Sequence, residues 1–228
     1  MEESAGYRPA STRARWATVL LIAWIVSAVL MAGADGTRIS VANGFLTGAS
    51  ASLSDAQSSD DLVRLATWTH LAAYVLVAIA FLMWLHRVVA NSWALGAHNL
   101  RFTPGWAVGW WFVPIANWVR PFQVVSEAWR AADSDDALST AASRGGHRLP
   151  AFLWMWWILY LLGSLIGSAG IVAGSTANSI TALRSRAEVD VASLAVGLVA
   201  ALLAVTVVQR LSKRQEAKAL VVAGRVQA

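Results

Sequence analysis

The sequence predicts an all-α integral membrane protein: a four-helix bundle with a short re-entrant or interfacial Trp-rich helix and an amphipathic helix on its cytoplasmic side. Of its 228 residues 57% are hydrophobic and 14% are charged, against ~45–50% and ~25% in soluble domains. The apolar residues are concentrated in four stretches nearly free of charge. Basic residues flank alternate ends of these stretches, which is the pattern that orients helices in a membrane.

The four stretches predict membrane spans, at about residues 16–34, 66–86, 150–173 and 190–209. Each has the ~20 apolar residues needed to cross a hydrocarbon core ~30 Å thick. A backbone in lipid must satisfy its own hydrogen bonds, so the spans are expected to be helices. The first span also resembles a signal peptide, but its apolar run exceeds the ~7–15 residues of a signal h-region, which favours a retained anchor.

The charges between the spans predict the topology. The tail at residues 1–15, the connection after the second span and the tail at residues 211–228 are basic, whereas the connection Asp35–Arg64 has an acidic excess. The positive-inside rule then places both termini in the cytoplasm of a bacterial plasma membrane, with residues 16–210 as one membrane domain. Ser58 and Asp61 are read as a capping box that starts the second helix near Asp60.

Residues 104–119 (PGWAVGWWFVPIANWV) are apolar but short and interrupted by proline and glycine. We expect them to form a re-entrant or interfacial helix on the cytoplasmic side. The alternative is a fifth span, which would place the basic tail outside. Residues 121–132 alternate apolar and polar side chains with a helical period and predict an amphipathic helix that begins with Pro121.

Several of these segments resemble an uncharacterised family of multi-pass membrane proteins common in actinobacteria, the domain of unknown function 4328. The resemblance rests on FLMWLHRVVANSWALG at 81–96, on PGWAVGWWFVPIANWVRPFQVVSEAWR at 104–130 and on VVQRLSKRQ at 207–215. It covers most of the chain. It implies a multi-pass membrane organisation and no particular activity.

Aromatic and polar residues of the middle segment are the candidate binding or structural residues. For the tryptophans, an aromatic belt with core packing competes with a pocket for a lipid, a quinone or a cationic headgroup. For the polar residues, a clasp that holds the broken helix competes with ligand or lipid binding. The set comprises Asn91, Trp106, Trp110, Trp111, Asn117, Arg120, Gln123, Glu127 and Trp129.

Within this set we predict one direct contact. Arg120 stands at the start of a helix, where a cation opposes the helix dipole. Glu127 follows two turns later on the same helix and is predicted to compensate Arg120 in a polar clasp.

Small residues line one side of each of the last two spans. Such faces let helices approach closely and pack by van der Waals contact. We predict that the two spans pack against each other, with homodimerisation through the same glycines as the alternative. The residues are Gly163, Gly167, Gly170 and Gly174 on the third span, and Ser193, Gly197, Ala200 and Ala204 on the fourth.

The sequence gives little support for catalysis or for a cofactor. It has no cysteine, which removes thiolate sites and disulfides. His70 and His86 share one helix and cannot bind one metal ion together, and Glu127 is the only carboxylate of the core motif. The net charge of +5 is explained by membrane flanks and does not predict nucleic acid. Between their ends the predicted spans carry no Asp, Glu, Lys or Arg, which argues against an ion path.

The sequence therefore favours a non-catalytic membrane protein that binds a lipid-like or protein partner at its cytoplasmic rim, in envelope organisation or signalling. A small-solute transporter or channel component is the first alternative. A membrane-embedded enzyme using Glu127 is the second.

Overall fold

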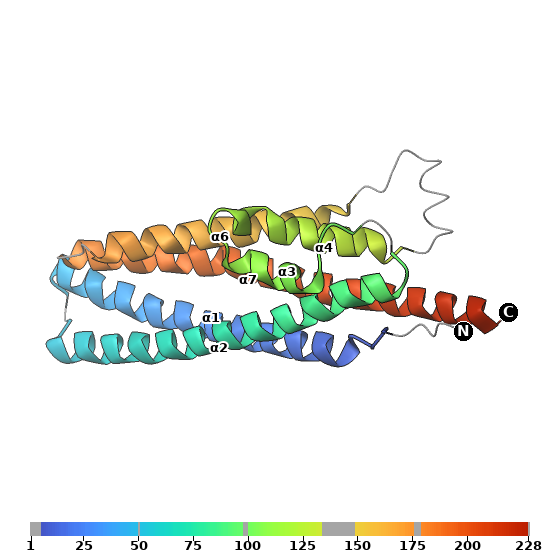
Figure 1. The fold of residues 1–228 in the computed structure, drawn as a ribbon. Coiled ribbons are helices and arrows are strands. Elements are labelled where there is room, and N and C mark those ends of the chain that lie inside the picture. Colours follow the sequence, from blue (N-terminus) through green and yellow to red (C-terminus); the bar gives the residue numbers. More distant parts are fainter. Residues whose placement is uncertain (1–5, 50, 98–99, 134–148, 176–178, 228) are drawn as a thin grey trace. The chain divides into compact units, whose positions relative to one another are not determined.

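The computed structural model describes residues 6–49, 51–97, 100–133, 149–175 and 179–227, and these parts are all-α, as predicted. Long helices make up most of them (Figure 1). These are α1 (Ser11–Thr47), α2 (Leu53–Ala94), α6 (Ala151–Ser175) and α7 (Ile180–Gln227). Short helices lie between α2 and α6: α3 (Pro104–Gly109), the 3-10 helices η1 (Trp110–Phe112) and η2 (Ala116–Trp118), and α4 (Arg120–Ala131).

Each of the four long helices is long and apolar enough to cross a membrane. In the most apolar window of each helix, only 22% to 28% of the residues are buried inside the protein. Most of the apolar surface of these windows therefore points away from the protein, as expected of helices whose solvent is lipid.

The long helices extend well beyond the predicted spans. The connection predicted at Asp35–Arg64 is mostly helical, because α1 continues to Thr47 and α2 begins at Leu53. The predicted cap at Ser58 is wrong: the Ser58 hydroxyl lies inside α2 and donates to the Ser54 carbonyl over 2.8 Å.

The capping box of α2 lies six residues earlier than predicted. The Ser52 hydroxyl accepts from the Asp55 backbone N–H at 3.2 Å, and the Asp55 carboxylate accepts from the Ser52 N–H at 2.8 Å. This reciprocal pair satisfies two backbone donors at the helix start.

The last connection and the carboxyl tail are also more helical than predicted. Helix α6 continues to Ser175 and α7 begins at Ile180, where the Ser179 hydroxyl accepts from the Ala182 N–H at 3.1 Å. The basic tail expected at 211–228 continues α7 as far as Gln227.

The chain divides into two compact units. Unit 1 comprises Met1–Val19, Ala78–Trp154 and Ala204–Ala228, and unit 2 comprises Leu20–Val77 and Met155–Leu203.

In unit 1, a buried polar seam joins α2 to α7. The Trp84 indole N–H donates to the Ser212 hydroxyl at 2.9 Å, and the Gln215 amide donates to the Val88 carbonyl at 2.7 Å. Trp84 and Gln215 are fully or almost fully buried. Their polar atoms therefore need these partners, and the bonds fix the register of the two helices.

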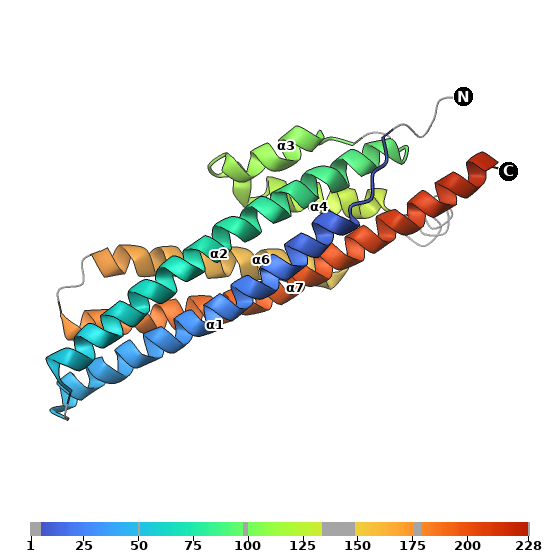
Figure 2. The same cartoon turned by 90° about the horizontal axis from the view of Figure 1, so that it is seen from below.

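In unit 2, α6 and α7 lie side by side (Figures 1 and 2), and small residues of the two helices meet between them. A Cβ atom added at Gly163 would lie 3.6 Å from the Gly197 nitrogen, and the Ser193 hydroxyl donates to the Gly163 carbonyl at 2.9 Å. A Cβ atom at Gly167 would lie only 3.0 Å from the Ser193 oxygen. The distance at Gly163 is ordinary van der Waals contact, whereas a side chain at Gly167 would require Ser193 to move.

The remaining residues of the small faces have separate outcomes. A Cβ atom at Gly170 would lie 3.0 Å from an Asp190 oxygen of α7. Ala200 of unit 2 and Ala204 of unit 1 are buried. Gly174 lies outside the residues whose surroundings the structure describes.

Candidate functional site

The Trp-rich segment of unit 1 folds as three short helical pieces rather than one re-entrant helix. The Thr103 hydroxyl caps α3 by accepting from the Trp106 N–H at 3.4 Å, and Pro104 occupies the first turn. Helix α3 has 6 residues, and η1 and η2 have 3 each. None of these pieces approaches the ~20 residues that a span needs. The five-span alternative therefore has no helix to support it.

A strained turn separates η1 from η2. Ile115 has φ 66° and ψ −49°, and the Ala116 N–H donates to the Pro114 carbonyl at 2.7 Å. This is the geometry of a γ-turn of the rare strained kind. Among the described residues other than glycine, Ile115 alone has a positive φ. A β-branched residue in this region costs of order 1–3 kcal/mol, so the rest of the segment must impose it.

The most exposed apolar side chains of the segment lie at the γ-turn and at the end of η1. Phe112 is 72% exposed and Ile115 is 86% exposed. Trp106, Trp118 and Val119 are each more than half exposed. Such a concentration of exposed apolar side chains is typical of a surface that meets lipid or a partner.

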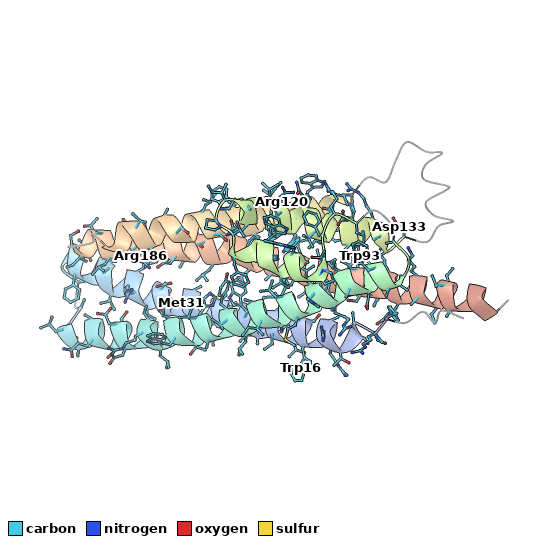
Figure 3. All side chains as sticks on the ribbon, viewed as in Figure 1. Trp16, Met31, Trp93, Arg120, Asp133 and Arg186 are labelled. Carbon is cyan, nitrogen blue, oxygen red and sulfur yellow. The ribbon has the colours of Figure 1, made fainter. Side chains whose placement is uncertain are left out.

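A cation lies directly beside this apolar stretch. The Arg120 guanidinium is exposed, lies 5.2 Å from the centroid of the Trp110 ring and donates to the Gln123 amide oxygen at 3.2 Å. The Trp110 ring in turn packs on Trp106 with 4.8 Å between centroids. A guanidinium on an indole face is held by cation–π attraction while its N–H groups stay available. Figure 3 labels Arg120, the first residue of α4, and Asp133, which lies two residues after the end of this helix.

Two buried polar atoms near this cation have no hydrogen-bond partner among the described residues. They are the Trp110 indole nitrogen and the Asn117 side-chain oxygen. Helix η1, which carries Trp110, packs against both η2, which carries Asn117, and α4, which Arg120 begins. Buried polar atoms are nearly always paired, so unpaired ones require an explanation such as a missing ligand. A donor, an acceptor and a cation thus belong to one small cluster, which we call the headgroup cluster: Trp110, Asn117 and Arg120.

Glu127 does not pair with Arg120, which corrects our prediction. Its carboxylate accepts from the backbone N–H groups of Arg101 and Phe102 at 3.0 and 3.2 Å and from the Arg101 side chain at 3.4 Å. Glu127 therefore anchors the residues that lead into α3 onto α4. The reason is the path of the chain, which presents two unpaired backbone donors to Glu127, whereas Arg120 finds Gln123 one turn away on its own helix.

Trp111, Trp129 and Asn91 serve the packing of unit 1. Trp111 meets Phe81 of α2 edge to face, with 5.5 Å between ring centroids. Trp129 is buried under the Arg214 guanidinium of α7, which lies 4.4 Å from its ring centroid. Asn91 is fully buried and holds the Arg8 backbone at both its N–H and its carbonyl, over 3.3 and 3.0 Å.

Basic residues of the tail make structural contacts with the end of α4, and the sequence did not lead us to predict these contacts. Arg214 forms an ion pair with Asp133, just after α4. Lys218 is buried and donates to the Ala131 carbonyl at 3.0 Å, at the carboxyl end of α4. A cation at this end favours the helix dipole. The three-residue spacing of Ser212, Gln215 and Lys218 was the available signal, since it places them along one face of a helix.

The comparison with known protein families matches residues 47–213 to the family described as Domain of unknown function (DUF4328). No curated protein and no solved structure matches the chain. The matched residues include α2, the Trp-rich segment, α4, α6 and most of α7. Because the match covers more than half of the sequence, the chain belongs to the DUF4328 family.

Proposed function

We propose that this member of the DUF4328 family is a non-catalytic, multi-pass membrane protein that binds the headgroup of an anionic phospholipid at the headgroup cluster. One observation carries the proposal. The Arg120 cation lies in the same cluster as the unpaired polar atoms of Trp110 and Asn117, beside an exposed apolar turn. Its role belongs to envelope organisation or signalling rather than to chemistry.

The chemistry of the cluster fits such a headgroup part by part. A guanidinium presents several N–H donors and binds phosphate well. The Trp110 indole N–H is a further donor, and the Asn117 side-chain oxygen is an acceptor for a headgroup hydroxyl. Phe112 and Ile115 project from the same segment and would lie among acyl chains. Phosphatidylglycerol, which carries one phosphate charge and free hydroxyl groups, is the simplest lipid of this description.

The arrangement of Glu127 supports a non-catalytic role for the cluster. Its carboxylate already accepts two backbone N–H bonds and contacts the Arg101 side chain. A general acid or base must reach the proton that it transfers, and it commonly works with a second titratable group. Glu127 instead resembles a structural acceptor that holds a loop.

The charge distribution supports an orientation in the bacterial plasma membrane with both termini in the cytoplasm. The chain has no cysteine, so single cysteines report without interference. Ser52→Cys and Ser179→Cys should react with an impermeant thiol reagent added outside cells. Ala97→Cys and Ala219→Cys should react only after the membrane is opened. Outside labelling at Ala219→Cys would contradict this orientation.

Lipid-dependent stabilisation tests the binding proposal. The full-length chain in detergent micelles would be titrated with phosphatidylglycerol or with phosphatidylcholine while its unfolding temperature is measured. A ligand that binds only the folded state raises that temperature. We expect phosphatidylglycerol to raise it and phosphatidylcholine to have little effect.

Matched variants tie the effect to the cluster. Arg120→Gln should abolish the rise, and Trp110→Phe, which keeps the ring and removes the N–H donor, should reduce it. Arg130→Gln, at an exposed arginine in the last turn of the same helix, should keep it. Equal stabilisation by both lipids, or a full rise in Arg120→Gln, would contradict the proposal and favour a protein partner at this surface.

A further inference from the structure

Unit 2 contains a buried carboxyl group that the proposed function does not use. Asp35 lies in α1, because this helix continues past the predicted end of the first span. Its side chain is 0% exposed, and neither of its oxygens has a hydrogen-bond partner among the described residues. An ionised carboxylate without partners is so costly to bury that such a group normally becomes neutral or acquires a counter-charge.

The charged groups around Asp35 are already paired with one another. Arg186 and Asp190, both on α7, form an ion pair at 2.8 Å. Arg38 of α1 forms another with Asp60 of α2, also at 2.8 Å. Asp190, Arg38 and Arg186 lie near enough to Asp35 to act on its charge.

These charges do not compensate Asp35. The two ion pairs contain two carboxylates and two guanidiniums and are neutral together, which leaves the Asp35 charge without a counterpart. Helix α6, the remaining helix of unit 2, carries no Asp, Glu, Lys, Arg or His. It contributes Gly170, which lies against Asp190. The cluster is therefore neutral only when one further unit of positive charge is bound.

We propose that Asp35 is a proton-binding site, at which one carboxyl oxygen carries a proton in the folded protein. A proton suits the site better than a metal ion. The described residues contain no group of three metal-ligating His, Cys, Asp or Glu side chains. A metal ion needs several ligand atoms around it, whereas a proton needs only one oxygen.

The site links α1 to α7. When the proton leaves Asp35 to solvent, the carboxylate that remains needs a counter-ion. Arg186, labelled in Figure 3, is the guanidinium on α7 that acts on Asp35. The Arg186 guanidinium would then interact with both Asp35 and Asp190, and its ion pair with Asp190 would weaken. Binding and release of the proton thereby change the contacts between two candidate membrane spans.

Infrared spectroscopy of the full-length protein in lipid nanodiscs tests the proposal at mildly acidic pH. A protonated carboxyl group gives a carbonyl band separate from carboxylate bands, and this band shifts in D₂O. We expect Asp35→Asn to remove the intensity of one carboxyl group. Glu188→Gln should leave that intensity unchanged, because Glu188 is paired with Arg184 and does not belong to the charged groups that act on Asp35. Full intensity in Asp35→Asn, or its loss in Glu188→Gln, would overturn the proposal.

Thermal unfolding gives a second measurement that does not depend on band assignment. Asparagine has nearly the shape of a neutral aspartic acid, so Asp35→Asn should keep the unfolding temperature of the wild type. A large fall would mean that Asp35 is ionised and held by an arginine. A metal-ion site would give a different result: sodium chloride would stabilise the wild type more than choline chloride does, and Asp35→Asn would abolish this difference. Either result would overturn the proposal.

Discussion

Replacing Glu127 by alanine should destabilise unit 1 strongly, although Glu127 belongs to a helix of only 12 residues. The substitution removes the acceptor of two backbone N–H bonds, from Arg101 and Phe102. Hydrogen bonds to a charged group each contribute about 1.5–3 kcal/mol. The Arg101 side chain is 62% exposed and adds under ~1 kcal/mol. The Glu127 side chain is 16% exposed, so water replaces part of the loss. We expect about 3 kcal/mol for Glu127→Ala.

Equilibrium unfolding in mixed micelles with increasing denaturing detergent measures this loss. Glu127→Gln keeps one carbonyl acceptor and should cost less, about 1–1.5 kcal/mol. Glu188→Ala is the matched control, because Glu188 forms an exposed pair with Arg184 on one helix at 2.9 Å. It should cost under ~1 kcal/mol. A loss in Glu127→Ala no larger than in Glu188→Ala would refute the loop-anchoring role.

A double-mutant cycle tests whether Glu127 anchors the loop before α3 or pairs directly with Arg120, as we predicted from the sequence. Because Arg120 and Glu127 bind different partners, the losses of Arg120→Ala and Glu127→Ala should add within ~0.5 kcal/mol. A coupling of several kcal/mol between them would restore the direct clasp.

Three further substitutions test the packing and the strained turn by the same unfolding measurement. Gly167→Leu should cost on the order of 2–4 kcal/mol, because even a Cβ atom there lies 3.0 Å from a serine oxygen of α7. Gly36→Leu is the control and should not destabilise, because a Cβ atom at Gly36 has open space around it. Trp84→Phe should cost about 2 kcal/mol, since it leaves the Ser212 hydroxyl without its buried donor and opens a small void. Ile115→Gly should stabilise by about 1 kcal/mol by releasing the positive φ, and an unchanged or lower stability would contradict the strain.

The membrane helices were predictable because the physics of lipid leaves few choices. A stretch of ~20 apolar residues must be helical, and a face of small residues must lie where helices meet. The contact of Gly163 with Gly197 is the direct outcome of that rule. The amphipathic helix observed from Arg120 to Ala131 followed equally from its period and from Pro121.

The helix ends were not predictable from the same signal. Outside the apolar windows, α1 and α2 are polar and rich in small residues, so that a loop and a helix have similar sequences there. Two serine–aspartate pairs had the capping-box pattern near the start of α2. The pair that caps is Ser52 with Asp55, and only the chain path distinguishes it from Ser58 with Asp61. The extension of α1 is also what brings Asp35 into the helix.

The partners of the candidate site depended on segments distant in sequence. Trp110 and Arg120 were identified as members of one cluster because they lie ten residues apart in one motif. The partner of Glu127 was not identified, because it is the backbone of a loop, which has no residue pattern of its own. The γ-turn at Ile115 could not be predicted, since isoleucine is among the residues least suited to a positive φ.

The most direct test of the headgroup cluster is a count of the lipids that leave the membrane with the protein. Native mass spectrometry would be applied to the full-length chain released from nanodiscs with equal amounts of phosphatidylglycerol and phosphatidylcholine. The account predicts that the wild type and Arg130→Gln retain phosphatidylglycerol in preference. Arg120→Gln, and Asn117→Ala to a smaller degree, should lose that preference. Equal retention of the two lipids by the wild type, or an undiminished preference in Arg120→Gln, would contradict the assignment of Trp110, Asn117 and Arg120 as a phospholipid site.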